Sequence, residues 1–137
     1  MDRPDLGALF AHVTRRLIDA ETPILAAHDL TMWEYVALSA LERETAPTQL
    51  ALARTIRYDK TRLIALLDGL ESRGLVARRP DPSDRRARVV SLTGAGERAV
   101  ASTRTDIRAM EEGFLAGLDA GDRAALLRAL PRLADPT

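Results

Sequence analysis

Hydrophobic residues recur at helical spacing in the centre of the chain. Over residues 57–73 the leucines occupy one face of a helix, at positions i, i+3, i+4 and i+7: Leu63, Leu66, Leu67 and Leu70. Gly74 is expected to end this helix, because glycine adopts the left-handed conformation that a helix C-terminus often requires. Two strand-like runs follow, residues 75–79 and 88–92, separated by the proline- and aspartate-containing turn 80–83. This pattern predicts a helix followed by a β-hairpin.

The same helical spacing recurs on both sides of this segment. It predicts five further helices, at residues 5–27, 31–44, 48–54, 93–117 and from Gly121 onwards. Polar residues at helix starts are candidate N-caps: Asp5, Thr31, Thr48 and Thr93, with Thr31 and Glu34 spaced as a capping box. Two prolines fall inside predicted helices, where we expect a kink or an interruption: Pro23 and Pro131.

The helices 48–54 and 57–73 are neighbours in the sequence, and a tight turn at residues 55–57 is expected to join them. Two helices with such a short connection, followed by a hairpin, are the layout of a winged helix-turn-helix. We therefore predict a mainly α fold with a small β-hairpin wing, in which residues 31–92 form a DNA-binding region.

The first and last helices lie outside this winged module and carry apolar faces of their own. Helix 93–117 spans about 36 Å at the helical rise per residue, which is more apolar length than a small winged module covers. Two copies of the chain could bury these faces around a two-fold axis. We therefore predict that residues 1–30 and 93–137 form N- and C-terminal dimerisation helices within one structural domain overall. The alternative is core packing within a single chain.

Charge is concentrated in the middle of the sequence. The 137-residue chain has 20 basic (Lys+Arg) and 20 acidic residues, yet residues 54–88 contain ten basic and five acidic side chains. The segment therefore carries a net charge of +5, which is the electrostatic footprint that binding to phosphate requires. The alternative is a solvated basic face that has no partner.

The sequence also disfavours several classes of protein. It has no cysteine, which excludes disulfides, cysteine-ligated metals and thiol redox sensing. No apolar run reaches the roughly 20 residues that span a bilayer, and the N-terminus has no secretory signal pattern, so we expect a cytoplasmic protein without a membrane partner. Because P-loop, dinucleotide and zinc-protease motifs are missing too, we expect no enzyme activity, no cofactor and no metal site.

The outward face of helix 57–73 supplies candidate contacts to DNA. Stepping roughly 100° per residue from Leu63 directs a first set of side chains away from the core: Arg57, Tyr58, Thr61, Arg62 and Ala65. Arginine can fork onto guanine, the methyl groups of threonine and alanine can meet the thymine methyl, and tyrosine can contact the DNA backbone. Lys60 lies on the flank, where a phosphate contact is expected, and Asp59 is better explained as a helix cap. The alternative for each is an ordinary surface residue.

The predicted wing carries a second group of candidate DNA contacts: Asp84, Arg85, Arg86 and Arg88. An acid two residues before an arginine can bond its guanidinium and hold it extended, which lowers the entropy lost when the arginine enters a narrow minor groove. We predict that Asp84 orients Arg86 in this way, and that Arg85 and Arg88 contact phosphate. The alternative is a surface salt bridge of little energetic value.

The segment LESRGLVARRPDPSDRRARVVSLTGAG resembles the one that defines the MarR family of bacterial transcription regulators. The shared features are a leucine-rich helix ending in an acidic residue, a basic residue and Gly-Leu-Val, then Asp-Pro-x-Asp-Arg-Arg, then Leu-Thr-x-x-Gly. The resemblance implies a homodimer with one winged helix-turn-helix per chain that binds palindromic promoter DNA. Many members have Thr or Ser and then Arg where this chain has Ile64 and Ala65, so Arg57, Thr61 and Arg62 are expected to do more of the reading.

The resemblance also implies a small-molecule effector, because family members often bind phenolic or other aromatic acids. By their location on the first two helices, the candidate ligand-binding residues are His12, Arg16, His28, Trp33 and Tyr35. The alternative is that Trp33 is a core residue and that each histidine is an ordinary surface or core residue.

We therefore expect a homodimeric, sequence-specific DNA-binding transcription regulator, acting as a repressor that a small aromatic or phenolic ligand relieves. The alternative is a winged-helix scaffold that binds proteins and does not bind DNA.

Overall fold

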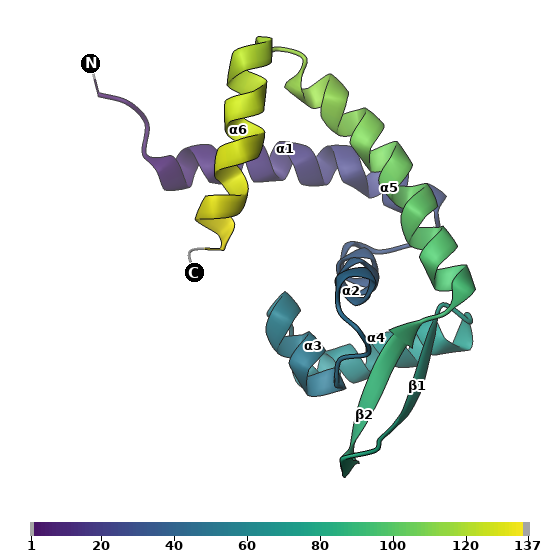
Figure 1. Ribbon diagram of the computed structural model, residues 1–137. Coiled ribbons are helices and arrows are strands. Elements are labelled where there is room, and N and C mark those ends of the chain that lie inside the picture. The colour runs from purple at the N-terminus through teal and green to yellow at the C-terminus, as the bar shows by residue number, and fades with distance from the viewer. Residues whose placement is uncertain (1, 136–137) are drawn as a thin grey trace.

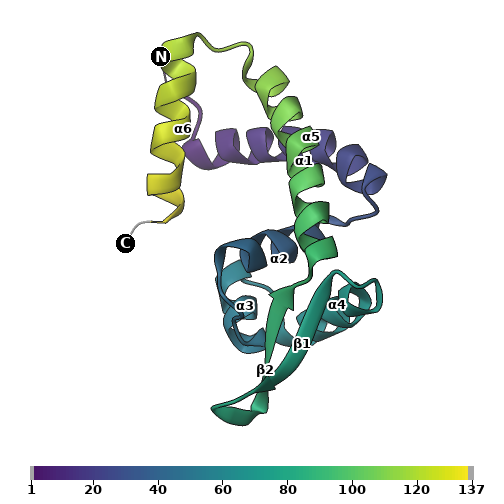
Figure 2. The same cartoon turned by 45° about the vertical axis from the view of Figure 1, so that its right-hand side comes forward.

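Six helices and one β-hairpin make up residues 2–135, the part of the chain that the structure, a computed structural model, describes (Figure 1). In chain order they are α1 (Leu6–Ala27), α2 (Met32–Arg43), α3 (Gln49–Ile56), α4 (Lys60–Ser72), β1 (Val76–Asp81), β2 (Asp84–Leu92), α5 (Gly94–Leu115) and α6 (Ala120–Ala134). Helices α2–α4 and the hairpin form a winged helix-turn-helix, whereas α1, α5 and α6 extend away on the other side of α2 (Figure 2). The predicted mainly α fold with a two-stranded wing is confirmed.

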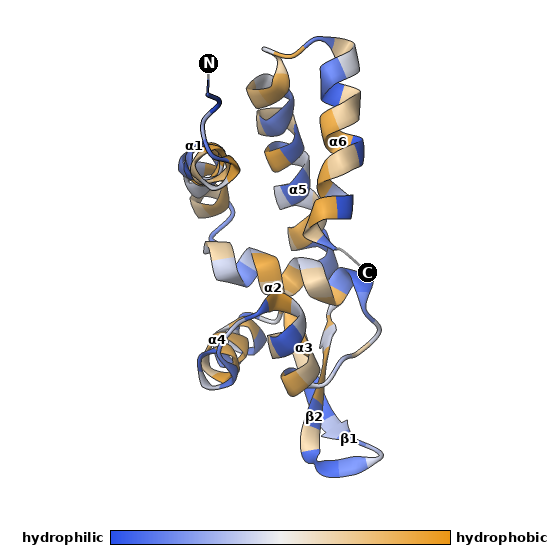
Figure 3. Ribbon diagram, turned by 90° about the vertical axis from the view of Figure 1, so that its left-hand side faces the viewer, coloured by the Kyte–Doolittle hydropathy of each residue, from blue (hydrophilic) through white to orange (hydrophobic). Residues whose placement is uncertain are grey.

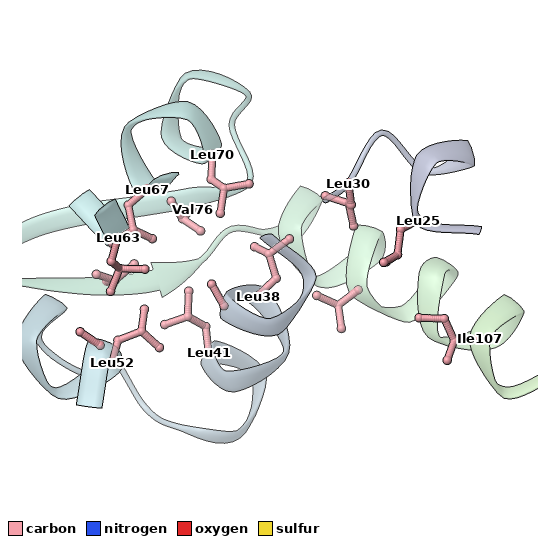
Figure 4. Close-up of a cluster of buried hydrophobic side chains, with 14 residues drawn as sticks. Leu25, Leu30, Leu38, Leu41, Leu52, Leu63, Leu67, Leu70, Val76 and Ile107 are labelled. Atoms are coloured by element: carbon pink, nitrogen blue, oxygen red, sulfur yellow. The ribbon is translucent and has the colours of Figure 1, made fainter. Parts of the chain in front are cut away.

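The leucines of α4 form the centre of the core. Leu63, Leu67 and Leu70 are completely buried, whereas Leu66 is only partly buried. They pack with leucines of α2 and α3 and with valines of the hairpin and α5: Leu38, Leu41, Leu52, Val76, Val90 and Val100 (Figure 4). Full burial of one such side chain stabilises the fold by about 1.5–3 kcal/mol, so this cluster fixes which face of α4 points inward.

Threonine side chains cap three of the helices, as predicted. Thr31 and Glu34 form a complete capping box at α2, with Glu34 Oε1 accepting from the Thr31 backbone at 2.8 Å. Thr48 Oγ1 accepts from Ala51 N at the start of α3, and Thr93 Oγ1 caps α5. Asp5 stands at the N-cap position of α1 but its side chain accepts no capping bond.

The last helix begins one residue earlier than predicted, and neither proline interrupts its helix. Helix α6 begins at Ala120 rather than at Gly121, because Asp119 is its N-cap and accepts from Asp122 N at 2.8 Å. Neither Pro23 nor Pro131 ends its helix: α1 continues to Ala27 and α6 continues to Ala134.

The turn between α3 and α4 lies two residues later than predicted. Helix α3 continues to Ile56, and Arg57 then adopts a left-handed conformation with φ of 54° that ends the helix. Asp59 starts α4, because its carboxylate accepts from Arg62 N at 2.8 Å. The connection is therefore residues 57–59, and α4, the helix predicted to read the DNA and called the recognition helix, spans 60–72 instead of 57–73.

Both strands of the hairpin are longer than predicted. Pro80 and Asp81, expected in the turn, belong to β1, and the bulge in the pairing falls between them. The hairpin is attached to the helix-turn-helix as well, since Val90 N donates to Pro47 O at 2.9 Å and Thr48 forms a bridge with Val89. The wing therefore starts from a base that is held against α3.

The Leu-Thr-x-x-Gly pattern joins α5 to the winged module. Gly74 ends α4 with φ of 74°, and its carbonyl accepts from Thr93 Oγ1 at 2.6 Å. Gly96 lies against the backbone of the same loop: a Cβ atom at this position would overlap the Leu75 carbonyl oxygen. Gly96 thus allows the first turn of α5 to lie directly on the end of α4.

Candidate nucleic-acid interface

Four of the predicted DNA contacts lie on the solvent-facing side of α4. Lys60, Thr61, Arg62 and Ala65 are exposed; Thr61, Arg62 and Ala65 point away from the buried leucines of the same helix, and Lys60 lies on the flank. They occupy the first two turns, which are the turns that enter the major groove in helix-turn-helix proteins. The structure therefore places these four side chains as the sequence predicted.

Two further candidates lie in the turn rather than on the helix. Arg57 is exposed in its left-handed conformation, and Tyr58 is half-buried. The Tyr58 ring stacks on Trp33, with ring centroids 4.5 Å apart. The side chain of Trp33 is at the surface, 39% exposed, which rules out the alternative that Trp33 is a core residue.

The wing tip is held by carboxylates that bond backbone amides. Asp81 Oδ1 accepts from the amide and the hydroxyl of Ser83, at 3.0 and 2.9 Å, and these bonds lower the pKa of Asp81. Asp84 Oδ1 accepts from the backbone N of Arg86 at 3.0 Å. Asp84 therefore bonds the backbone of Arg86 and not its guanidinium, where the sequence predicts the bond.

The recognition helix and the wing meet at one cleft. Lys60 of α4 lines it together with Asp84, Arg86 and Arg88 of β2, and residues 48–50 at the start of α3 complete it. Arg85, Arg86 and Arg88 are exposed. Two groups of candidates from separate parts of the sequence therefore lie on the same face.

Two of the basic residues counted toward DNA are used inside the protein instead. Arg78 has only 4% of its side chain exposed, and its Nη2 contacts Glu71 at 2.9 Å and Asp68 at 2.5 Å. The bond to Arg78 lowers the pKa of Glu71. Arg73 pairs with Glu34 and donates to the carbonyl of Asp29. Strand alternation could have identified the first case, because Arg78 lies two residues from the buried Val76 and so on the same face of β1.

The sequence comparisons identify the family. The profile of the MarR family matches residues 28–87, from the end of α1 to the wing. The transcriptional regulator HosA of Escherichia coli O111:H- is 35% identical over 104 residues, which are 76% of this chain and 76% of HosA. The chain belongs to the MarR family.

Other MarR-family relatives match this chain over almost its whole length. The HTH-type transcriptional repressor NicR of Pseudomonas putida is 28% identical over 135 residues, 96% of this chain and 85% of NicR. The repressor CouR bound to a 23-mer DNA duplex has a TM-score of 0.83 at 28% identity, covering 96% of this chain and 93% of CouR. CouR from Rhodococcus jostii RHA1 bound to p-coumaroyl-CoA has a TM-score of 0.80 at 28% identity, covering 97% and 94%.

The five predicted ligand-binding residues are not gathered in one pocket. His12 and Arg16 both line a small hollow on α1, and the guanidinium carbon of Arg16 lies 4.9 Å from the centroid of the Phe114 ring. His28 Nε2 lies 2.6 Å from Asp106 Oδ2 of α5, and Trp33 contacts Tyr58. Tyr35 lines a cleft between helices, whereas Arg16 lines a different groove, between α1, α5 and α6.

This interhelical cleft has a volume of about 360 Å³ and is bounded by α1, α2, α3 and α5. Its polar lining includes three arginines, two glutamates, Tyr35 and Ser39; the charged residues are Arg43, Arg104, Arg108, Glu21 and Glu111. Arg104 pairs with Glu42 and Arg108 with Glu111, whereas Arg43 takes part in none of the ion pairs within residues 2–135. Burial raises the pKa of Glu21, and the charge of Glu111 raises it further.

Within residues 2–135, no helix has the length and apolar character needed to cross a membrane. The same residues contain no group of three or more His, Cys, Asp or Glu side chains that is arranged to hold a metal ion.

Arg78→Ala should lower the midpoint of thermal unfolding more than Arg79→Ala, because Arg79 is the exposed neighbour on the same strand. The loss should depend on pH. The pKa of Glu71 is lowered from its ordinary 4.5, so the stability due to this pair is present above that value and is lost as pH falls through the lowered folded value. A series of circular dichroism melts from neutral pH down through the acid range should therefore show the difference between wild type and Arg78→Ala shrinking as pH falls. Equal effects of the two substitutions, or a pH-independent difference, would contradict this assignment.

Proposed function

We propose that this MarR-family chain is a homodimeric transcription repressor that binds palindromic promoter DNA through the outward face of α4 and through the wing. The observation that carries the proposal is the shared cleft of Lys60, Arg86 and Arg88. It places cations from the recognition helix and from the hairpin on one face, where consecutive phosphates of a duplex can meet both.

The roles of individual residues follow from their positions. Arg62 and Thr61 face outward in the first turn of α4 and are proposed to contact base edges in the major groove. Ala65 offers a methyl group one turn later, and Lys60 is placed for phosphate. Arg86 is proposed to enter the minor groove at the wing tip, with its backbone already ordered by Asp84. The likeness of this chain to CouR, which was solved with a 23-mer DNA duplex, supports DNA binding.

Homodimer formation is proposed because the N- and C-terminal helices expose large apolar side chains. Leu6, Phe10 and Val13 of α1 are 57%, 46% and 41% exposed, and α6 has no buried residue. These residues belong to an apolar groove that α1 forms with the end of α5 and with α6, the side of the molecule where Figure 3 shows hydrophobic residues far from the wing. Continuous apolar surface of this kind is usually covered by a partner. We assign residues 1–30 and 93–137 to dimerisation and 31–92 to DNA binding.

A small aromatic or phenolic acid is the proposed effector, and the interhelical cleft is its proposed site. The cleft connects the proposed dimerisation helices α1 and α5 to α2 and α3, so a ligand there can favour one separation of the two recognition helices. Tyr35 offers an aromatic surface and a hydroxyl group, and Arg43 offers a guanidinium for a carboxylate. The complex of CouR with p-coumaroyl-CoA supports an aromatic acyl group as the ligand class.

DNA binding should be sequence-specific and salt-dependent. We expect the protein to select a duplex from a random-sequence library, and Arg86→Ala to weaken binding to that duplex by about 1–3 kcal/mol. Arg128→Ala, which changes an exposed arginine of α6, is the matched control and should leave affinity unchanged. Fluorescence anisotropy titrations at several salt concentrations measure both effects.

If the protein shows no preference over random duplex and no salt dependence, the DNA-binding proposal fails. The protein-binding scaffold would then be the better interpretation of the fold.

Phe10→Asp should convert the dimer into a monomer, because it places a charge in the exposed apolar face of α1. Light scattering coupled to size-exclusion chromatography should report twice the chain mass of 15.0 kDa for wild type and the single mass for the variant. Leu50→Asp is the control, since Leu50 of α3 is similarly exposed at 41% but lies in the winged module. A monomeric wild type would contradict the proposed dimer.

Ligand binding should depend on Arg43. We expect at least one member of a panel of hydroxybenzoates and hydroxycinnamates to raise the thermal unfolding midpoint and to weaken DNA binding. Arg43→Ala should abolish this shift, whereas Arg128→Ala should retain it. A ligand that binds Arg43→Ala as strongly as wild type would exclude the interhelical cleft as its carboxylate site.

A further inference from the structure

Two aromatic rings and one guanidinium form a continuous stack from α2 to the recognition helix. The rings of Trp33 and Tyr58 have centroids 4.5 Å apart and are inclined at 34°. The guanidinium carbon of Arg62 lies 5.2 Å from the centroid of the Tyr58 ring. Arginine over an aromatic face is attracted by the ring quadrupole, and offset or tilted ring pairs are favourable arrangements. We call these three residues the aromatic stack.

The far end of the stack is rigid. Trp33 belongs to the first turn of α2, which the capping box of Thr31 and Glu34 closes. Glu34 uses its second oxygen to pair with Arg73 at the end of α4. Trp33 therefore projects from a turn that is fixed both to its own helix and to the C-terminal end of the recognition helix.

The other end of the stack is the Arg62 guanidinium, which forms no ion pair within residues 2–135. The backbone N of Arg62 is held by Asp59, but its exposed guanidinium takes part in none of the ion pairs within residues 2–135. The Arg62 guanidinium lies instead over the Tyr58 ring. Tyr58 itself is fixed in the turn, since its backbone N donates to Ala53 O at 2.9 Å.

We propose that Trp33 is a positioning residue for DNA recognition, which acts through Tyr58 to hold the guanidinium of Arg62 in its binding orientation. The inference rests on the proposed DNA-binding function and adds a residue that touches no base. Trp33 limits the rotation of the Tyr58 ring, and the Tyr58 face limits the rotamers of Arg62. An arginine with fewer accessible rotamers loses less entropy when it forks onto a base edge.

A double-mutant cycle on a duplex selected by the wild-type protein tests this assignment. We expect Trp33→Ala to weaken binding about threefold to tenfold, the size expected for an aromatic or cation–π contact, and Trp33→Phe to restore most of the affinity. In an Arg62→Ala background, Trp33→Ala should have almost no further effect, because the group it positions is gone. In an Arg85→Ala background the full effect of Trp33→Ala should remain, which is the matched control.

A measurement without DNA tests the stack directly. Trp33 is the single tryptophan, so its fluorescence reports on this site alone. Tyr58→Leu should shift the emission to longer wavelength because the indole loses its cover, whereas Arg62→Ala should change it little. Circular dichroism melts of every variant check that the fold is retained.

The outcomes separate the two proposals. If the wild-type protein selects no duplex, the DNA-binding function fails, and the positioning role falls with it. If Arg62→Ala weakens binding but Trp33→Ala does not, only the positioning role is overturned. It is equally overturned if Trp33→Ala is just as damaging without Arg62, since Trp33 would then act by another route, such as direct contact with the duplex.

Discussion

Burial of Leu63, Leu67 and Leu70 fixes the rotation of α4 about its own axis. Each is fully buried, and turning the helix by one residue, roughly 100°, would expose all three and bury polar side chains in their place. Burial of each side chain contributes about 1.5–3 kcal/mol. Losing all three would therefore remove much of the roughly 5–15 kcal/mol by which a typical domain is stable. The outward direction of Thr61 and Arg62 is therefore a consequence of the core.

Apolar packing fixes rotation about the axis, whereas polar contacts fix the ends of the helix. Asp59 starts α4, and Arg73 connects its last turn to Glu34 of α2. The buried Arg78 side chain extends from β1 to the more exposed carboxylates of Asp68 and Glu71 on α4, so the wing cannot change its angle to α4 without breaking these ion pairs. Ion pairs with carboxylates this exposed to solvent add modest stability. The contribution of Arg78 is better understood as geometric, because it keeps two DNA-facing elements in one relation.

The spacing of apolar residues is sufficient to predict the helices and the hairpin. It does not predict the irregular turn before α4 or which side chains meet across helices. The six helices and the hairpin follow from the spacing of apolar residues, and the threonine caps follow from residue type. The sequence predicts too early a start for α4, because Arg57 adopts a left-handed conformation that residues other than glycine rarely adopt. The candidate ligand residues were grouped only by their helices, yet His28 bonds α5 while Trp33 faces Tyr58. Proximity of this kind depends on how helices cross, which spacing along the chain does not encode.

In the folded chain, the acidic residues of segment 54–88 do not neutralise its exposed arginines. Arg73 and Arg78 are used in internal pairs, and so are Asp68 and Glu71; the net charge of +5 over residues 54–88 is therefore unchanged when these four are set aside. Three acids remain: Asp59, Asp81 and Asp84. Each directs a carboxylate oxygen to a backbone amide, on Arg62, Ser83 and Arg86 respectively. These carboxylates stabilise the backbone turns next to the arginines and form no ion pairs with the arginine side chains of residues 2–135. The basic side chains therefore stay available to phosphate. A neutral protein can in this way present a cationic face, because its local acids serve the backbone.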